Sequence, residues 1–540
     1  MSSYILSLII WIPLLGAFTL LFFRERQSSG IKIVALIFSL IQLLLSIRLV
    51  WRFDSNYGDN LLTSFQFVEK FSWISMNLGS LGRLNIDYHL GVDGISLWLV
   101  VLSAFIMFIG VIASWKLKQQ VRSYFILYLL LSYSIVGCFL ALDFFLFYVF
   151  FELVLLPMFF LIGLWGGPRR SYASIKFFIY TLVGSLLILI VMITLYLSVG
   201  AFDPHSEMMI HSFNLLHMMD SHYFIEGSSL AKDSLLTFVG MPIRSVAFLT
   251  LFLGFAIKLP IVPFHTWLPD AHVEAATPIS VILAALLLKL GGYGLYRIAF
   301  SIFPDAALNF GSSIAIVGVL AIIYGGLNAM AQNDLKRMIA YSSISHMGFV
   351  LIGLGSLTIE GAAGGMFQMI AHGFISAALF LLVGVLYDRT QNRIISNFSG
   401  LASKLPGYSF VATIVFFASL GLPGLAGFVG ELLVLMGAFK VNLALVTLPS
   451  WIGIGAVIGL LITAAYYLWT IQRMFLGKYW VRKSSWQSKM QDLDIREWLI
   501  FAPLILGIIV LGIYPKAVLD TMNHSIELFV AHVTNFKIKL

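Results

Sequence analysis

The sequence has one cysteine, Cys138, and few charged residues, which make up 11% of its 540 residues. A lone cysteine in an apolar segment cannot form an internal disulfide and cannot supply the thiolates that an iron–sulfur cluster or a zinc ion needs. The sequence also lacks a nucleotide-binding fingerprint, a nucleophile motif and a zinc motif. We therefore expect no cofactor, no metal and no redox centre in this chain, so the energy that drives it must come from elsewhere.

The sequence consists largely of long apolar runs. Hydrophobic residues make up 60% of the sequence and the mean hydropathy is +0.96, which is typical of a polytopic membrane protein. The first run lacks the basic segment and the cleavage site of a signal peptide, so we interpret it as the first span. Fourteen runs have membrane-spanning length, near residues 4–23, 31–51, 95–114, 123–141, 143–164, 176–199, 245–264, 278–298, 311–331, 336–355, 363–387, 408–438, 449–473 and 498–514.

The distribution of lysine and arginine predicts the orientation. Loops after odd-numbered spans hold twenty of these residues, whereas loops after even-numbered spans hold seven, although two of the latter, 52–93 and 203–244, are long. Because cytoplasmic loops are enriched in lysine and arginine, the odd-numbered loops are predicted to be cytoplasmic and both termini to lie on the outer side. We expect a multi-pass protein of the bacterial inner (plasma) membrane, or of the thylakoid membrane if the source is cyanobacterial.

The stretch 251–297 places two lysines, Lys258 and Lys289, inside apolar runs. A lysine near the centre of a bilayer costs about 2.5 to 3.5 kcal/mol on insertion scales, so each needs a partner, a water-filled cavity or a function. Pro260 and Pro263 follow Lys258 and cannot donate to the carbonyls four residues earlier, so the helix is predicted to break beside this lysine. A broken helix next to a buried charge indicates an ion path; the alternative is that each ammonium snorkels to the headgroups.

A second span carries a similar break. In 416–431, Pro423 frees the carbonyl of Ser419, and four glycines leave one side of the backbone bare. The stretch 255–260 resembles 417–423, and the two breaks lie five spans apart, so the two broken helices run in opposite directions through the membrane. This arrangement is typical of an inverted repeat with ion sites near the midplane.

The predicted fold is therefore an all-α polytopic membrane protein of about 14 transmembrane helices, with two inverted five-helix repeats, spans 4–8 and 9–13, each with a broken helix. Four segments follow from it: 1–122 with spans 1–3 and an outer loop, 123–298 with the first repeat, 299–473 with the second, and 474–540 with the last span and the C-terminal tail.

Two carboxylates also lie within spans. Glu152 lies mid-span, with Pro157 one turn later, and Glu431 lies two turns after Pro423 with no positive charge on its own span. Carboxylates inside a membrane are rare and usually functional. The alternatives are a structural ion pair for Glu152 and a permanently protonated acid for Glu431.

Histidines with polar neighbours form a third group. His346 follows a serine-rich turn, and Gln368, His372 and Ser376 recur at four-residue spacing, which makes a polar stripe along one apolar helix. Histidine with hydroxyl and amide neighbours can shuttle protons, since its unperturbed pKa is near neutral. The alternative is a hydrogen bond that only holds two helices together.

The remaining histidines lie outside the predicted spans. His265 and His272 fall in a cytoplasmic loop, for which we consider proton uptake, subunit contact or a plain loop, because Pro269 disrupts the spacing that metal ligands would need. Four more, His205, His211, His217 and His222, lie in the long outer loop 203–244 without recurring ligand spacing, which favours a solvated loop over a metal site.

Several long motifs resemble one family, the antiporter-like membrane subunits of respiratory complex I, NADH:quinone oxidoreductase. The resemblance extends from YHLGVDGIS at 88–96 to Arg473 and is carried by Phe151-Glu152 with Pro157 and by KLPIVPFHTWLPDAHVEAATPIS, LLLKLGGYG, NDLKRMIAYSSISHMG and AHGFISAALFLLVG. It implies a proton path through six side chains: Glu152 and Lys258 as the pair of a first half-channel, Lys289 with His346 or His372 as a connecting axis, and Glu431 as the end of a second half-channel.

Within that family the chain is similar to subunit M. The sister pumping subunits have a lysine where this chain has Glu431, and the roughly 26 residues after the last span do not suffice for the long lateral helix of subunit L. The resemblance implies other membrane subunits of complex I, including sister antiporter-like subunits, as partners besides membrane lipid, and no nucleic acid.

Three functions remain open. The first is a proton-translocating subunit of a redox-driven NADH (or ferredoxin):quinone oxidoreductase, and the second is a subunit of a multi-subunit sodium/proton antiporter, which shares the fold. The third is a membrane scaffold whose charges are structural. Glu431 and the subunit M motifs favour the first over the second, and the number of mid-span charges argues against the third.

Overall fold

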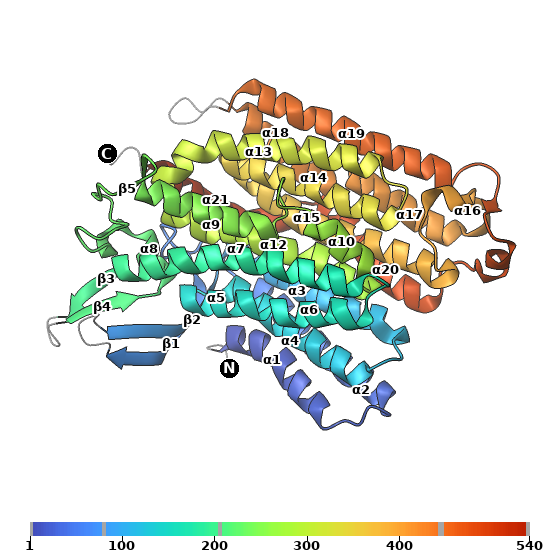
Figure 1. Ribbon diagram of the computed structural model, residues 1–540, viewed down its shortest axis with the longest axis horizontal. Helices are drawn as coiled ribbons and strands as arrows, with labels where there is room; N and C mark the ends of the chain where they lie inside the picture. Colours follow the sequence, from blue (N-terminus) through green and yellow to red (C-terminus); the bar gives the residue numbers. More distant parts are fainter. Residues whose placement is uncertain (1–3, 78–82, 204–207, 441–447, 536–540) are drawn as a thin grey trace.

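The computed structural model describes residues 4–77, 83–203, 208–440 and 448–535. Long helices run side by side, and most of the strands lie at one end of the bundle (Figure 1). Among the described residues eleven helical segments are long and apolar enough to cross a membrane: α2 (Ser28–Trp51), α3 (Gly94–Ala113) with η2 (Ser114–Lys116), α4 (Val121–Leu140), α5 (Phe144–Leu153) with α6 (Leu155–Trp165), α7 (Arg170–Ser198), the segment Thr277–Phe300, α13 (Pro304–Met330), α14 (Leu335–Gly355), α15 (Ile359–Thr390), α19 (Ser450–Met474) and α20 (Ile495–Ile513).

Shorter helices complete the bundle. They are α1 (Ile5–Leu21), α8 (Leu215–Met219), η3 (Ser221–Tyr223), α9 (Ile243–Lys258), α10 (Trp267–Glu274), η6 (Ile395–Asn397), α16 (Leu401–Lys404), α17 (Pro406–Ser419), α18 (Ala426–Phe439), η7 (Ser484–Lys489) and α21 (Lys516–Thr534). The helical membrane fold expected from the apolar runs is confirmed, whereas the count of fourteen spans and the two inverted repeats stay predictions.

The two long polar segments contain strands, which the sequence analysis did not anticipate. A four-stranded sheet of order β1-β2-β4-β3 joins β1 (Gln66–Asn77) and β2 (Arg83–Val92) to β3 (Gly200–Asp203) and β4 (Met208–Ser212). The pairs β1–β2 and β3–β4 are antiparallel and β2–β4 is parallel. Two-stranded pairs form from β5 (Thr237–Phe238) with β6 (Met241–Pro242) and from β7 (Phe398–Ser399) with β8 (Trp480–Val481).

We call the end of the bundle that carries β1–β4 the sheet end, and the opposite end, where Lys116, Arg337 and Arg393 lie, the basic end. The helix α1 begins beside the sheet, because the backbone N–H of Leu6 donates to Glu69 of β1 at 2.8 Å. The C-terminal helix α21 also lies toward the sheet end (Figure 1).

The helix α21 falls in the segment that the sequence analysis assigned to the tail. Its polar residues hold the start of α3: Ser525 Oγ accepts from the backbone N–H of Gly94 at 2.9 Å, and Thr521 Oγ1 accepts from Trp98 Nε1 at 2.6 Å. The buried positions Met522 and Phe529 face the bundle. An amphipathic helix of this kind is missed by a search for wholly apolar runs.

Burial separates central from peripheral helices. Within an apolar stretch of 18 residues in each segment, all residues of Thr277–Phe300 and 94% of those of α14 and α15 are buried, whereas only 39% of those of α7 and α20 are. The exposed positions of α7 are apolar, for example Ile179 and Ile190, as expected of a face in contact with lipid. Three of the predicted site residues, Lys289, His346 and His372, therefore lie on the helices at the centre.

Both predicted helix breaks occur, and they have the same hydrogen bonds. At the end of α9 the N–H of Leu259 donates to Phe255 O and that of Ile261 to Ala256 O; at the end of α17 the N–H of Leu420 donates to Phe416 O and that of Leu422 to Phe417 O. The helices α9 and α17 enter from opposite ends of the bundle (Figure 1). This match pairs Lys258 with Ser419 and Pro260 with Gly421, so the equivalence of Pro260 and Pro423 suggested by the sequence is wrong by two residues.

Candidate functional site

Lys258 is the last residue of α9 and its side chain is buried at the first break. Its Nζ donates to the carbonyl oxygen of Phe151 at 3.3 Å and lies 3.4 Å from the centre of the Phe151 ring. That carbonyl lies in the last turn of α5, directly before the interruption at Val154, and no backbone N–H of the described residues across this interruption donates to it. The ammonium therefore binds the free backbone oxygen and the ring face, which is a cation–π contact.

Glu152 follows Phe151, so the structure brings the predicted first pair close in space. Within the described part of the chain, however, no ion pair joins Glu152 to Lys258, and Glu152 Oε1 is buried without a hydrogen-bond partner. The two residues are thus neighbours across the α5–α9 contact that do not touch. Their role as a pair stays a prediction.

Lys289 lies at the centre of the molecule. The segment Thr277–Phe300 consists of α11 (Thr277–Ile282), the π-helix η4 (Leu283–Leu287), α12 (Leu288–Gly294) and the π-helix η5 (Leu295–Phe300). Lys289 is fully buried, and its Nζ donates to Ala284 O at 2.7 Å and lies 2.8 Å from His372 Nδ1. A π-turn leaves carbonyls available to a side chain and is frequent at functional sites.

His372 lies on the polar stripe of α15, where Gln368, His372 and Ser376 are all buried. The rings of His372 and His346 have centroids 5.7 Å apart. The structure places both histidines next to each other, with His372 on the side of Lys289. Their roles in a connecting axis stay predictions.

His346 links the axis to the second break. Its Nδ1 lies 3.4 Å from Glu431 Oε1 and 3.5 Å from the amide nitrogen of Gln368, and its Nε2 lies 3.2 Å from Ser419 Oγ. A cavity of about 10 Å³ opens between His346, His372 and Ser419. A cavity of this volume has room for about one water molecule.

Glu431 lies in α18, just past the second break, and is buried. Gly421 makes its position possible, because a Cβ at Gly421 would collide with Glu431 Oε2. Gly430 likewise leaves space for Gln368. Two of the four glycines around Pro423, Gly421 and Gly430, therefore serve the close approach of the Glu431 carboxyl group and of α15.

Hydroxyl groups of α19 complete this part of the site and were missed in the sequence. Thr463, Tyr467 and Thr470 are buried, at spacing that places them on one face of α19. Tyr467 Oη lies between Ser419 Oγ at 2.8 Å and Ser342 Oγ at 3.0 Å. Thr463, Tyr467 and Thr470 are four and three residues apart, and this helical spacing of polar residues in an apolar span could have identified them in the sequence.

At the basic end, His272 differs from its predicted place in a loop. It lies in α10, is fully buried, stacks on Phe380 with centroids 4.3 Å apart, and has no hydrogen-bond partner at either ring nitrogen. Pro269 does not disrupt α10 because it lies in the first turn, where no intrahelical N–H donor is needed. His265 precedes α10, and its ring makes an edge contact with Tyr324.

A cavity of about 370 Å³ opens at the basic end beside α10 and α11. At its inner side Lys336, buried at the start of α14, donates to Ala275 O at 2.6 Å. The cavity lining contains charges of both signs: Lys116, Glu274, Lys336, Asp388, Arg393, Arg496 and Glu497.

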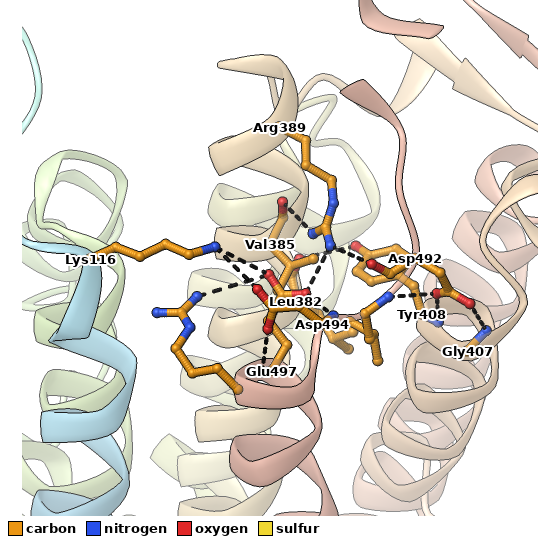
Figure 2. Close-up of polar contacts among 11 residues, drawn as sticks. Lys116, Leu382, Val385, Arg389, Gly407, Tyr408, Asp492, Asp494 and Glu497 are labelled. Atoms are coloured by element: carbon orange, nitrogen blue, oxygen red, sulfur yellow. Dashed lines mark hydrogen bonds and ion pairs between the residues drawn. The ribbon is translucent and has the colours of Figure 1, made fainter. Parts of the chain in front are cut away.

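Lys116 and Glu497 of this cavity lining belong to a cluster of charged residues that we call the basic-end cluster (Lys116, Arg389, Asp492, Asp494 and Glu497). Figure 2 shows Lys116 and Arg389 reaching Glu497 from two sides, with Arg389 at 2.8 Å and Lys116 at 4.0 Å. Asp492 accepts from the backbone N–H groups of Gly407 and Tyr408, at the first turn of α17. The cluster thus joins the ends of α3, α15, α17 and α20.

The histidines of the outer loop do not come together. His211 lies in β4 against Tyr196, His217 stacks on Tyr223, and His222 is paired with Asp220 at 2.7 Å. His205 lies outside the described residues. Across the described ranges no group of three His, Cys, Asp or Glu side chains could hold a metal ion.

Arg297 was counted among the loop cations but lies in η5, where it is buried. Its guanidinium is paired with Asp93 at 2.5 Å and lies over the ring of Phe65. Asp93 is also the N-cap of α3, in a capping box with Ser96. A buried ion pair of this kind holds the sheet end to the central helix, and nothing in the linear sequence separates it from a loop cation.

The comparisons with known proteins identify a family. The family described as "NADH:quinone oxidoreductase/Mrp antiporter, TM" matches residues 141–459. The chain is 40% identical to NADH-quinone oxidoreductase subunit M of Rhodobacter capsulatus over 527 residues, 97% of this chain and 95% of that one.

Solved structures give the same result for the fold. A chain of respiratory complex I from Thermus thermophilus with bound NADH is similar with a TM-score of 0.79 at 28% identity, covering 99% of this chain and 100% of that one. A chain of the Mrp complex from Dietzia sp. has the same TM-score of 0.79 at 19% identity, with 99% of each chain covered, and so shares the fold alone. The resemblance indicated by the motifs is confirmed: the chain belongs to the NADH:quinone oxidoreductase/Mrp antiporter family of membrane subunits.

Proposed function

We propose that this chain translocates protons as a membrane subunit of an NADH:quinone oxidoreductase, in the manner of subunit M, and that it carries no redox centre. One observation carries this proposal: Lys289, His372, His346 and Glu431 follow one another in the buried centre of the molecule. The proton path proposed here runs through Glu152, Lys258, Lys289, His346, His372 and Glu431.

The spacing of the axis suits proton transfer. A donor and an acceptor exchange a proton when they lie within hydrogen-bond reach or share one water. Lys289 Nζ and His372 Nδ1 are 2.8 Å apart, within hydrogen-bond reach. His346 Nδ1 and Glu431 Oε1 are 3.4 Å apart, at ion-pair distance, and among the described residues Oε1 has no hydrogen-bond partner. Between the two histidines lies the cavity of about 10 Å³, which is large enough for one bridging water.

Structural charges alone explain this centre poorly. A buried cation that serves only packing is expected to have a carboxylate partner, as Arg297 has in Asp93. Lys289 has a neutral carbonyl and an imidazole instead, and Lys258 has a carbonyl and a ring face. Both lysines can therefore lose a proton without leaving a carboxylate unpaired, which supports proton transfer over a scaffold.

We further propose that the basic end faces the cytoplasm and that both termini lie on the outer side of a bacterial inner membrane or a thylakoid membrane. The excess of lysine and arginine in the loops of the basic end supports this orientation. Protons would then enter the chain from the basic end, and the energy would arrive through contacts with other subunits of the complex. An electron donor of either kind, NADH or ferredoxin, is compatible with this arrangement.

A sodium/proton antiporter subunit is the second candidate, because the Mrp complex shares the fold. The identity of 40% to subunit M of Rhodobacter capsulatus over nearly the whole chain favours the first. The two candidates differ in whether translocation depends on electron transfer to quinone or on sodium.

The experiment that tests the proposal replaces Lys289 by methionine, which keeps the length and removes the charge. We expect the complex to assemble and to lose most of its proton translocation, measured as protons per electron pair in membranes with matched complex content. Lys404→Met, at an exposed position of the basic end, is the matched control. Wild-type translocation by assembled Lys289→Met would contradict the proposal.

A further inference from the structure

Three hydroxyl groups from three helices meet beside His346, and we call them the hydroxyl chain: Ser419 of α17, Tyr467 of α19 and Ser342 of α14. Ser419 Oγ donates to Tyr467 Oη at 2.8 Å, Tyr467 Oη donates to Ser342 Oγ at 3.0 Å, and Ser342 Oγ donates to the carbonyl oxygen of Ile339 at 2.8 Å. All three side chains are buried. The chain of donors runs in one direction and ends on a backbone carbonyl, which can only accept.

This direction determines which nitrogen of His346 carries hydrogen. A hydroxyl group has one hydrogen to donate, and that of Ser419 is used toward Tyr467. Ser419 Oγ can then only accept from His346 Nε2, which lies 3.2 Å away. The neutral imidazole therefore carries its hydrogen on Nε2, and Nδ1 has the free lone pair.

The other side of the ring is consistent with this tautomer. The amide nitrogen of Gln368, a donor, lies 3.5 Å from Nδ1. Glu431 Oε1 lies 3.4 Å from the same Nδ1. A proton that His346 takes up binds at Nδ1, where it faces Glu431, and its transfer to Glu431 Oε1 returns His346 to the neutral Nε2–H form and leaves a neutral carboxyl group.

We propose that Tyr467 and Ser419 are positioning residues that hold His346 in the Nε2–H tautomer, so that proton exchange between the axis and Glu431 takes place at Nδ1. This inference rests on the proposed function and deepens it. If the hydroxyl chain is cut, Ser419 can donate to Nε2, and the neutral imidazole can then carry its hydrogen on Nδ1. In that form Nδ1 cannot accept a proton, and exchange with Glu431 fails.

The adjacent Tyr466 offers a matched control. It is as buried as Tyr467, and its hydroxyl group lies near Thr463, Ser342 and Tyr467, but it does not stand between Ser419 and Ser342 in the hydroxyl chain. Tyr467→Phe should lower proton translocation about tenfold in assembled complex, because an imidazole in the wrong tautomer is a poor base, whereas Tyr466→Phe should remain near wild type. Equal translocation by the two variants would overturn the inference.

A second pair keeps the test decisive if Tyr467→Phe fails to assemble. Ser419→Ala removes the acceptor of Nε2. Its control is Ser343→Ala, because Ser343 is also buried but donates to the carbonyl oxygen of Ile339 outside the hydroxyl chain. We expect Ser419→Ala to lose translocation and Ser343→Ala to keep it. Loss in both, or in neither, would show that the hydroxyl group of Ser419 is not the cause.

Glu431→Gln in the same membranes separates this inference from the proposed function. If Glu431→Gln loses translocation while both Tyr467→Phe and Ser419→Ala keep it, only the positioning role is wrong. If Glu431→Gln translocates at the wild-type level, the proposed function itself fails.

Discussion

Gly421 shows how one residue without a side chain supports a buried carboxyl group. It has a positive φ of 79°, and a Cβ there would collide with Glu431 Oε2. Gly424, three residues later, also has a positive φ, of 90°, but no heavy atom lies near the place of its Cβ. Substitutions at the two glycines can therefore distinguish the effect of backbone strain from the effect of a collision with Glu431.

Gly421→Ala is expected to lower proton translocation and assembly more than Gly424→Ala does. Both variants place a Cβ in the left-handed region, which costs about 1 to 2 kcal/mol, but only the first displaces the carboxyl group of Glu431. The measurement is complex content in membranes together with protons per electron pair. If the two variants have the same complex content and the same proton translocation, the contact between Gly421 and Glu431 does not matter for function.

For individual residues, the sequence identified the buried charged side chains but did not predict which groups they contact. Lys258, Lys289 and Glu431 stand out because charge within an apolar run is rare. That Lys258 would bind the carbonyl of Phe151 instead of Glu152 depends on the interruption between α5 and α6, and that His372 would reach Lys289 depends on the π-turn before it. Both are details of backbone geometry that spacing alone does not give.

Among the elements, α5 begins at a buried carboxyl group whose pKa is unusually high. Asp143 is its N-cap and accepts from the backbone N–H groups of Leu146 at 3.0 Å and of Asp87 at 3.2 Å. Burial raises the pKa of Asp143 to about 7, although these two N–H groups oppose the shift and nearby Asp87 adds to it. The cap thus ties α5, the helix that carries Glu152, to the strand β2.

The sign of the pH dependence follows from this pKa. A carboxyl group whose pKa is raised by folding binds its proton more tightly in the folded state, so its stabilising contribution is present below pH 4 and is lost as the pH rises through 7. Asp143→Asn keeps a good N-cap and removes the ionisation. We expect this variant to be more heat-stable than wild type at pH 8 and to lose that advantage at pH 5, measured as the unfolding midpoint of the purified complex.

Asp494, the N-cap of α20, is the control for this prediction. Burial raises its pKa, but the N–H of Glu497 and the ammonium of Lys116 outweigh burial, so the net shift is downward. Asp494→Asn should therefore bring no gain in stability at pH 8. The account of Asp143 is wrong if Asp143→Asn changes stability equally at both pH values.

Helices and their breaks could be predicted where they depend on residues close together in the sequence. Proline marked both broken helices, and the apolar runs gave the long helices to within several residues, for example 363–387 against Ile359–Thr390. The sheet was not predictable in the same way, because β2 pairs with β4 from a segment more than a hundred residues away. The helix α21 was missed because only one of its faces is apolar.

For the whole molecule, orientation is the property that the loop charges predict. Lys404 ends α16 and Ser229 lies between η3 and β5, and α16 and β5 are at opposite ends of the bundle (Figure 1). Cysteines placed at these two exposed positions should be labelled from opposite sides by an impermeant reagent in oriented vesicles. Cys138 is buried and leaves the background low. The cytoplasmic assignment of the basic end requires that Lys404→Cys react from the cytoplasmic side, and labelling of both from one side would exclude the topology.

The central claim is that protons pass through the buried axis and reach Glu431. Glu431→Gln keeps the shape and hydrogen bonding of the side chain but cannot exchange a proton, so it is the most direct variant. We predict that the complex assembles and that proton uptake per electron pair falls, that Glu431→Asp retains part of it, and that Glu431→Lys retains some, since the sister subunits have a lysine there. Full proton uptake by Glu431→Gln at matched complex content would contradict the account.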